Sequence, residues 1–278
     1  MKPLSLFLLA FIALQAVPAS SEDEPMSQHI HRYLHEKNVV IVGAAWQKAD
    51  AVVRATVDPF PEQGIDLEQL GVDPDYASYY LEWRHRFSQK WGLVAAAQTF
   101  QSDGDIVAQR DFNFGGVEFP AGIDINTELS VDIYFIDLMY HAYSSDRAEV
   151  SIGGGLHAFD TAVDISGKLF IGEGEFAGSG SSGELLAPLP NLRASAFYAF
   201  TDRLSTFATL GWLSADVDEW SGSFTYLHAR FHYAFTERWG SSLGYQYTDV
   251  DVTRDRGRRE TAFDMQFRGP TLQLTYLF

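Results

Sequence analysis

Apolar and polar residues alternate along most of this chain of 278 residues. The pattern is clearest at the C-terminus, where Leu272, Leu274, Tyr276 and Phe278 alternate with polar residues up to the last position. A period of two is typical of β-strands, because successive side chains point to opposite faces. Pairing such a final strand with the first would leave no open edge. The ending therefore predicts a strand that closes a sheet, with one apolar, aromatic face.

The same alternation predicts ten strands, separated by turn-forming and polar segments. Their expected ranges are 39–56, 77–87, 91–103, 126–143, 148–166, 186–200, 204–216, 223–235, 239–252 and 263–278. Eight or twelve strands would follow if one long connection were misassigned. Several ranges exceed the roughly 9–11 residues that cross a bilayer, so the wall should continue outward as β-ribbons. We predict an all-β fold, a closed antiparallel transmembrane β-barrel of about ten strands.

A short phrase recurs between predicted strands: an aromatic residue, Ser or Thr, then charged or polar residues. It starts at Phe87, Tyr143, Phe200 and Phe235. Each copy predicts a tight turn, and the flanking aromatic residues suit a membrane interface. We expect these four turns on the periplasmic side. The longer connections, at 57–76, 101–125, 167–184, 216–222 and 253–262, are expected outside the cell.

The alternation changes phase at two places, near residues 133–136 and at Gly269-Pro270. A β-bulge inserts one extra residue and shifts the phase of a strand. Pro270 also has no N–H to donate to a ladder. We therefore predict a bulge at each place.

The N-terminal residues predict export. Lys2 precedes an apolar run over residues 4–16, and small residues follow up to Ser20. This arrangement is typical of a signal peptide, here residues 1–19. Residues 20–38 would form a periplasmic tail with a short helix, and residues 39–278 the transmembrane barrel. We expect the protein in the outer membrane of a Gram-negative bacterium.

Composition narrows the class. The chain has no Cys, which excludes disulfides, thiolate metal sites and thiol catalysis. Its net charge of −17 argues against nucleic-acid binding. Mean hydropathy is only −0.11, which suits a barrel because every second residue faces the lumen. We expect no cofactor and no metal.

Placing the aromatic and aliphatic residues toward lipid sends charged residues into the lumen. The predicted lumenal charge network comprises Glu82, Arg84, Arg86, Asp137, His141, Glu149, His157, Arg193, His228, Arg230 and His232. An unpaired buried charge is costly, so the simpler interpretation is a structural core in which opposite charges pair. The alternative is a narrow, charge-lined channel for a small solute or ion.

The chain shows no convincing catalytic motif, and we predict no catalytic residue. His141 with Ser144 or Ser145 is the nearest Ser/His pair, but it falls at a predicted turn, where Ser has an ordinary structural role. His31 and His35 would share a helix face, a spacing that can bind a transition metal. Two histidines without a third ligand are weak evidence, and a helix that is solvated or caps the periplasmic mouth is the simpler expectation.

The first long connection is acidic, with Asp58, Glu62, Asp66, Glu68, Asp73 and Asp75 and no Lys or Arg. Divalent cations could bridge such carboxylates to lipopolysaccharide phosphates. A solvated loop kept soluble by its charge is the simpler interpretation.

The chain resembles a family of small proteobacterial outer-membrane β-barrel proteins, of the OmpA-like and porin-like kind. The resemblance rests on turn phrases such as Phe200-Thr201-Asp202-Arg203, and on a Gly-Pro pair followed by alternation up to Phe278. It covers residues 39–278 and implies the architecture and location, but no reaction. It implies as partners outer-membrane lipid, lipopolysaccharide and the barrel-assembly machinery. The machinery would read Leu272, Leu274, Tyr276 and Phe278 as an assembly signal.

The expected function is a structural or narrow porin-like barrel that is not an enzyme. Two alternatives come from other classes. A membrane-embedded hydrolase or lipid A-modifying enzyme would need a polar cluster at the outer rim, with perturbed pKa values. An adhesin or receptor would act through the acidic outer loops.

Overall fold

The structure is a computed structural model. It describes residues 30–57, 63–66, 73, 75–109, 111–114, 117–171, 174–181, 185–217, 220–255 and 259–278. The predicted signal peptide and residues 20–29 of the predicted tail lie outside the described residues, as do Asp58, Glu62 and Glu68 of the acidic connection.

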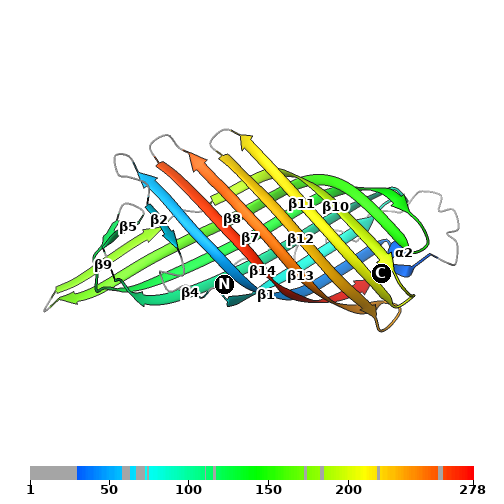
Figure 1. The fold of residues 1–278 in the computed structure, drawn as a ribbon, viewed down its shortest axis with the longest axis horizontal. Coiled ribbons are helices and arrows are strands. Elements are labelled where there is room, and N and C mark those ends of the chain that lie inside the picture. Colours follow the sequence, from blue (N-terminus) through cyan, green and yellow to red (C-terminus); the bar gives the residue numbers. More distant parts are fainter. Residues whose placement is uncertain are drawn as a thin grey trace.

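Ten long antiparallel strands form a closed barrel, as the alternation predicts (Figure 1). They are β1 (Asn38–Val57), β3 (Asp75–Arg86), β4 (Trp91–Val107), β7 (Asp124–Ser144), β8 (Ala148–Ile171), β10 (Leu185–Ala199), β11 (Leu204–Val217), β12 (Trp220–Ala234), β13 (Trp239–Asp255) and β14 (Arg259–Leu277). Each strand pairs with its neighbour in this order, and β14 pairs with β1 in a register that sets Leu277 opposite Val39. The first and last strands therefore close the wall.

Four short strands accompany the ten strands of the wall. β2 (Gln63–Asp66) pairs with β1, and β9 (Gly174–Ser181) pairs with the end of β8. β5 (Phe112–Phe114) and β6 (Val117–Phe119) form a separate two-stranded ribbon. The expected β-ribbons are therefore present, and the ribbon around β9 lies at the opposite end of the barrel from α2 (Figure 1).

The four predicted tight turns are all present, at residues 87–90, 145–147, 200–203 and 235–238. In each, a hydroxyl accepts a hydrogen bond from the backbone N–H three residues later: Ser88 from Trp91, Ser145 from Ala148, Thr201 from Leu204 and Thr236 from Trp239, at 2.9–3.1 Å. This bond explains why Ser or Thr recurs just after the aromatic residue, one position on in three turns and two positions on, at Ser145, in the fourth.

All five expected long connections are shorter than predicted, because the strands continue into them, and two are reduced to two or three residues. β11 continues to Val217 and β12 begins at Trp220, while β13 continues to Asp255 and β14 begins at Arg259. Polar residues can continue the strands there, because the outer face of the wall meets water beyond the bilayer and need not be apolar.

The two faces of the wall exchange polarity along long strands such as β7, β13 and β14. In the half of β7 near the short turns, Asp137 is buried in the lumen while Leu138 is exposed on the outside. In the other half, Ile125 and Leu129 are buried inside while Glu128 is exposed. An apolar outer face suits lipid, and a polar outer face around an apolar core suits water. The exchange therefore places the membrane boundary across the middle of the wall.

This exchange corrects the two predicted bulges. The pairing of β7 runs through residues 133–136 without a register shift, and the pairing of β13 with β14 runs unbroken through Gly269 and Pro270. The phase of the hydrophobic pattern changes there because the polarity of the faces is reversed, not because a residue is inserted. The register shift that β7 does show lies between His141 and Tyr143.

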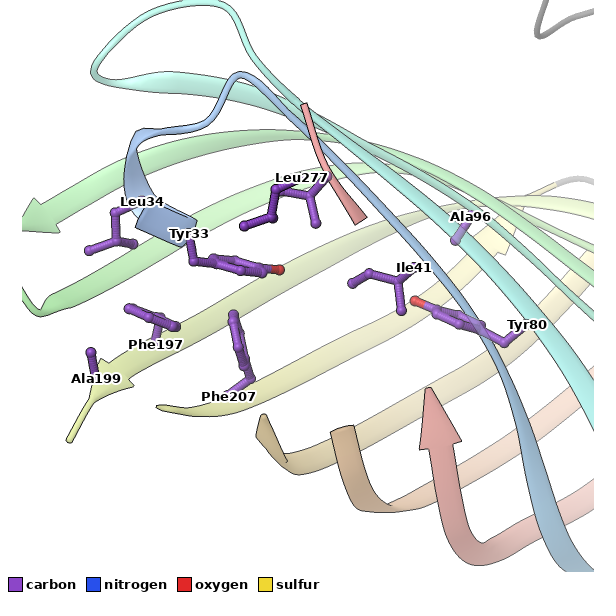
Figure 2. Close-up of a cluster of buried hydrophobic side chains, with 10 residues drawn as sticks. Tyr33, Leu34, Ile41, Tyr80, Ala96, Phe197, Ala199, Phe207 and Leu277 are labelled. Carbon is purple, nitrogen blue, oxygen red and sulfur yellow. The ribbon is translucent and has the colours of Figure 1, made fainter. Parts of the chain in front are cut away.

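A single helical turn, α2 (Arg32–His35), lies inside the end of the barrel that carries the short turns. Its Tyr33 and Leu34 are buried in an apolar cluster with Phe197, Phe207 and Leu277 of the wall (Figure 2). No helix in the described part of the chain is long and apolar enough to span a membrane. The segment before β1 packs as a plug in the mouth of the barrel at the end of the short turns.

Candidate functional site

The middle of the lumen holds a buried ion cluster built from three strands. The Glu82 carboxylate of β3 accepts hydrogen bonds from Arg84 Nε at 2.5 Å and from Arg193 of β10 at 3.3 Å, and the Tyr80 hydroxyl also donates to it. The other arm of Arg193 donates to Asp137 Oδ2 of β7 at 3.2 Å. The exposed fractions of Glu82 and Asp137 are 1% and 0%. These carboxylates are thus fully enclosed and held by guanidinium groups.

The cluster continues into β8. His157 Nε2 lies 2.8 Å from the Asn191 amide and 3.8 Å from Asp137. The Arg193 guanidinium lies 4.7 Å from the centre of the Phe135 ring, which stacks on His157. Phe135 is therefore a lumenal residue, although the hydrophobic pattern alone suggests a lipid-facing one.

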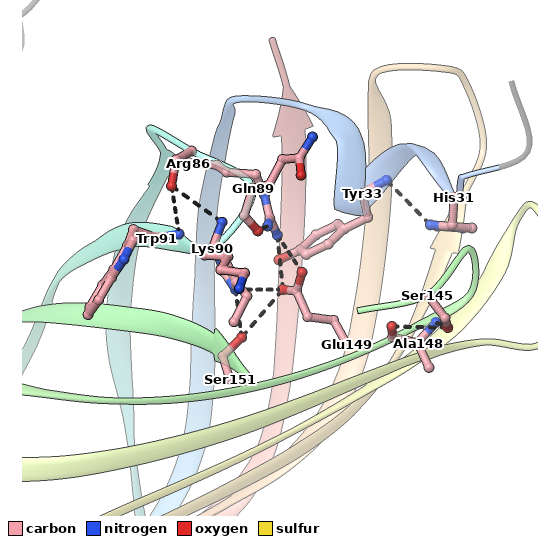
Figure 3. A network of polar contacts seen from close by, with 12 residues as sticks. His31, Tyr33, Arg86, Gln89, Lys90, Trp91, Ser145, Ala148, Glu149 and Ser151 are labelled. Carbon is pink, nitrogen blue, oxygen red and sulfur yellow. Dashed lines mark hydrogen bonds and ion pairs between the residues drawn. The ribbon is translucent and has the colours of Figure 1, made fainter. Parts of the chain in front are cut away.

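A second charge cluster lies nearer the plug and the short turns (Figure 3). Arg86 of β3 donates to both oxygens of Glu149 of β8, at 2.9 and 2.7 Å. His141 Nδ1 lies 3.1 Å from Glu149 and 2.8 Å from the Ser151 hydroxyl. The structure therefore joins three of the predicted lumenal residues and adds Ser151.

Ser144 and Ser145 have the ordinary turn role expected of them, and neither pairs with His141. Ser144 is exposed, and the Ser145 hydroxyl is bonded to the backbone of its own turn. Ser151 was missed by sequence reasoning, although it lies two residues after Glu149 and so on the same face of β8. His141 uses one nitrogen for both Ser151 and Glu149, whereas a Ser–His–acid relay needs the acid on one nitrogen and the serine on the other. This group is therefore not built as a nucleophilic triad.

The three predicted residues of β12 bind neutral partners. Arg230 donates to Gln273 at 2.7 Å and lies over the Phe207 ring at 4.5 Å. His228 is bonded to Thr271 and His232 to Ser242, both at 3.0 Å. These three side chains therefore contribute to a polar lining with neutral partners.

Above the ion cluster lies a layer of neutral side chains that sequence reasoning did not single out. The Ser78 hydroxyl donates to Gln47 at 2.7 Å, and Gln98 donates to Ser78 at 3.0 Å. Gln246 of β13 reaches across to Gln98 at 3.1 Å. The sequence does place a Gln on the inward face of each of β1, β4 and β13. Such residues look like ordinary polar lining as long as the neighbouring strands across the lumen are unknown.

The outer part of the lumen is filled by apolar side chains. They include Ile125, Leu129, Val131, Leu213, Phe224, Val250, Val252, Met265 and Phe267, all buried. Two cavities in the lumen have volumes of about 60 and 20 Å³, enough for only a few water molecules. Three layers, ionic, amide and apolar, therefore fill the barrel.

The plug packs against the wall at the end of the short turns through aromatic side chains. Tyr33 stacks on Phe197 at a ring distance of 5.3 Å and meets Phe207 edge-on at 4.4 Å. His31 caps α2, because its Nδ1 accepts a hydrogen bond from the Tyr33 N–H. Burial lowers the pKa of His31 below its ordinary value, against the opposing effect of Asp202.

His31 and His35, whose spacing alone could suit a transition metal, point to different surroundings. His31 faces the Phe197 ring and His35 is exposed. Among the described residues, no group of three or more His, Cys, Asp and Glu side chains is placed to hold a metal ion.

The four residues of the expected assembly signal are placed on the outer face of β14 and at its end. Leu272, Leu274 and Phe278 are exposed and Tyr276 is partly exposed. The backbone of Phe278 exchanges two hydrogen bonds of 3.0 Å with Asn38. The C-terminus therefore completes the ladder that closes the barrel.

No protein-family model matches the chain, and no curated protein matches it. Among solved structures, the outer-membrane protease OmpT from Escherichia coli has a TM-score of 0.55 and 8% identity, covering 87% of this chain and 97% of its own. The chain has the fold of an outer-membrane β-barrel.

Two more distant likenesses are to OprG of Pseudomonas aeruginosa and Ail of Yersinia pestis. OprG has a TM-score of 0.35 and 12% identity, covering 91% of this chain and 100% of its own. Ail, the attachment invasion locus protein, has a TM-score of 0.30 and 11% identity, covering 85% of this chain and 98% of its own.

Proposed function

We propose that this protein is a sealed, non-enzymatic outer-membrane barrel whose rigid, acidic outer half projects from the bilayer into water. Its lumen stabilises the wall and conducts nothing. The working part of the protein is the outer surface of the half that stands in water. The observation that most directly supports this proposal is the exchange of polarity between the two faces of the wall.

The filled lumen supports the absence of a conduit. A conducting pore needs a continuous path lined by water or polar groups. Here the ionic and amide layers are followed by an apolar layer of side chains such as Val252, Met265 and Phe267, which are at most 4% exposed. Apolar constrictions exclude water. A small polar solute would therefore be blocked first by the hydrogen-bonded side chains and then by the dry apolar layer.

The outer surface of the upper half supports exposure to water. Asp103, Asp105, Asp124, Glu128 and Asp251 are exposed on strands whose opposite faces are apolar. A charged residue facing lipid at the bilayer midplane would cost about 2–4 kcal/mol. These positions therefore belong outside the hydrocarbon, and they give the projecting half an acidic surface.

The proposal that the protein is not an enzyme rests on geometry. The His141 group, the only one described above that combines Ser, His and a carboxylate, has its bonds on the wrong nitrogen for a relay. The carboxylates of the ion cluster are held by guanidinium groups in a closed lumen, where no substrate reaches them.

We further propose that lipid and lipopolysaccharide surround the apolar lower half, and that the barrel-assembly machinery reads β14. The exposed aromatic residues around the short turns, among them Phe87, Trp91, Phe235 and Trp239, suit the periplasmic interface. The outward side chains of Leu272, Leu274 and Phe278 are accessible along the seam with β1.

Single cysteines test this placement, because the chain has none of its own. Asp251→Cys places a thiol on the projecting half, and Glu237→Cys places one on a periplasmic turn. Intact cells are treated with a membrane-impermeant maleimide. We expect Asp251→Cys to be labelled in intact cells, and Glu237→Cys only after the outer membrane is permeabilised. Labelling of Glu237→Cys alone in intact cells, or of neither variant under either condition, would contradict the proposal.

A further inference from the structure

A groove of about 880 Å³ crosses the outer face of the apolar lower half, over strands β4, β7, β8, β10 and β11. Its rims carry large side chains that point away from the lumen, such as Ile152, Leu192 and Leu210, with exposed fractions of 48–61%. Its floor lies at the small outward residues Gly154 and Ala194. Pockets that hold a small ligand usually have about 300–1,000 Å³. The groove is therefore large enough for a ligand, whereas the lumenal cavities are not.

The register of the strands sets the direction of the groove. Trp91 lies opposite Tyr140, and Tyr140 lies opposite Ile152. Ile152 lies opposite Ala194, and Ala194 lies opposite Leu210. Such a row runs perpendicular to the strands, and its four steps of about 4.8 Å span about 19 Å. Trp91 begins β4 directly after a short turn, whereas Leu210 lies in the interior of β11, so the groove rises from the short turns into the apolar band.

The inclination of the groove keeps it within one leaflet. Strands of outer-membrane barrels tilt by about 35–45°, so a row of about 19 Å perpendicular to them rises by about 11–13 Å. One leaflet supplies about 15 Å of the hydrocarbon core. With the short turns in the periplasm, which is part of the proposed function on which this inference rests, the groove lies in the periplasmic leaflet. Its surroundings are then acyl chains, and its apolar lining suits one of them.

The lower end of the groove carries positive charge. The short turn before β4 ends at Lys90, which is exposed and directly precedes Trp91. This turn has a base and no acid, whereas the other three short turns place an acid directly before Arg147, Arg203 and Arg238. A base near the membrane surface attracts anionic lipid, and a Trp ring suits the level of the headgroups. The lower end of the groove therefore fits an anionic headgroup.

We propose that this groove binds one acyl chain of an anionic phospholipid, phosphatidylglycerol, from the periplasmic leaflet. The headgroup phosphate lies at Lys90. The chain passes the rings of Trp91 and Tyr140, whose centres are 5.1 Å apart, and crosses the floor at Gly154 and Ala194. Dispersion contacts on several sides hold a chain more firmly there than on the convex wall elsewhere.

Two other neighbours of the wall fit the groove less well. A second copy of the barrel would present a convex wall of its own, which meets the raised rims before it reaches the floor. Lipopolysaccharide belongs to the outer leaflet, whereas the charged end of the groove lies beside a short turn. A phospholipid of the periplasmic leaflet fits both the shape and the charge.

The test uses the full mature chain folded in detergent micelles. Phosphatidylglycerol and phosphatidylethanolamine with the same acyl chains are added in turn, and native mass spectrometry counts the lipids that each barrel retains. We expect one retained phosphatidylglycerol, bound about fivefold more tightly than phosphatidylethanolamine, since one base near an anionic headgroup contributes about this factor. Lys90→Gln should remove the preference, whereas Arg238→Gln on another turn should keep it. Equal binding of the two lipids, or an unchanged preference in Lys90→Gln, would overturn the choice of an anionic headgroup.

Ala194→Leu fills the floor of the groove from the outside, so it should fold, as judged by heat-modifiable gel migration, and lose the retained lipid. Ala208→Leu is the matched control, because Ala208 is also exposed on the outer face but does not line the groove. No retained lipid on the parent, or a lipid that Ala194→Leu retains as the parent does, would overturn the proposal. A parent dimer that disappears in Ala194→Leu would assign the groove to a second copy and would also overturn it.

The cysteine labelling described above separates this inference from the proposed function on which it rests. Labelling as expected, together with no retained lipid, overturns only the binding of lipid in the groove. Labelling that contradicts the proposed placement overturns the assignment of the groove to the periplasmic leaflet as well.

Discussion

Glu82→Gln removes the charge at the centre of the lumen and keeps the shape of the side chain. In the parent, this carboxylate accepts from Arg84, Arg193 and Tyr80, and its exposed fraction is 1%. The variant leaves four guanidinium groups facing two carboxylates. The amide oxygen can still accept hydrogen bonds, but the amide N–H₂ points two donors at groups that are themselves donors.

The expected loss follows from burial. Breaking a buried ion pair by removing one charge costs about 3–5 kcal/mol, because the partner charge remains uncompensated. Glu82 bonds to two guanidinium groups, so we expect the free energy of unfolding to fall by at least the lower end of that range. The barrel should still assemble, because the ladder that closes the wall is untouched.

Urea unfolding in lipid vesicles, followed by Trp fluorescence, measures this loss. Glu237→Gln is the matched control. Its carboxylate pairs with Arg32 at 3.0 Å, but its side chain is 85% exposed, and exposed ion pairs contribute about 0–1 kcal/mol. If Glu82→Gln costs no more than Glu237→Gln, the ion cluster does not hold the lumen together and the reasoning is refuted.

Three further predictions concern the wall and the plug. A Cβ at Gly155 would lie 1.8 Å from a carbonyl oxygen of β7 and 2.6 Å from an oxygen of the buried carboxylate there. Gly155→Ala should therefore lower the midpoint of urea unfolding by an amount worth about 1–3 kcal/mol, whereas Gly211→Ala, whose Cβ would meet nothing closer than 3.5 Å, should change it little. Val252→Asp puts a carboxylate into the apolar outer layer and should cost about 3 kcal/mol or more, while the same charge at exposed Gln101 should cost at most about 0.5 kcal/mol; equal losses would contradict the exchange of faces. Because burial lowers the pKa of His31 from 6.5, the seated plug is fully stable above pH 6.5 and loosens as pH falls below it. Hydrogen exchange of the Tyr33 amide should accordingly accelerate in acid beyond its intrinsic rate, and His31→Asn, which caps without titrating, should abolish that dependence.

The alternation of side chains was enough to predict the architecture. All ten strands, the four short turns and the closure by the last strand follow from local patterns that the structure confirms. The turns were recognisable because one hydroxyl bond repeats at each of them. The inward residues of β3 and β12 could be assigned because their outward neighbours, such as Phe231 and Tyr233, are aromatic.

The exchange of polarity between the two faces was mistaken for bulges, because a single rule, that apolar residues face outward, was applied to the whole length of each strand. An apolar residue points outward where the wall meets lipid and inward where the wall meets water. Phe267 and Leu272 lie on opposite faces for this reason, and no bulge separates them. Sequence alone does not give the height of the membrane boundary, so the phase change was taken for an inserted residue.

The partners within the lumen could not be read from the chain. Arg193 and Glu82 are separated by 111 positions, and their meeting depends on the diameter and register of the barrel. Ser151 and the amide layer were missed for the same reason, since Ser and Gln are ordinary lining until a cross-strand neighbour is known.

Single-channel recording in a planar bilayer is the most direct test of the sealed lumen. The protein is first shown to be folded by heat-modifiable gel migration and is then added at low concentration under an applied voltage. The three filled layers predict a folded barrel that inserts and gives no discrete conductance steps in simple salt. Reproducible steps of uniform size from the folded parent protein would show a continuous aqueous path and contradict this account.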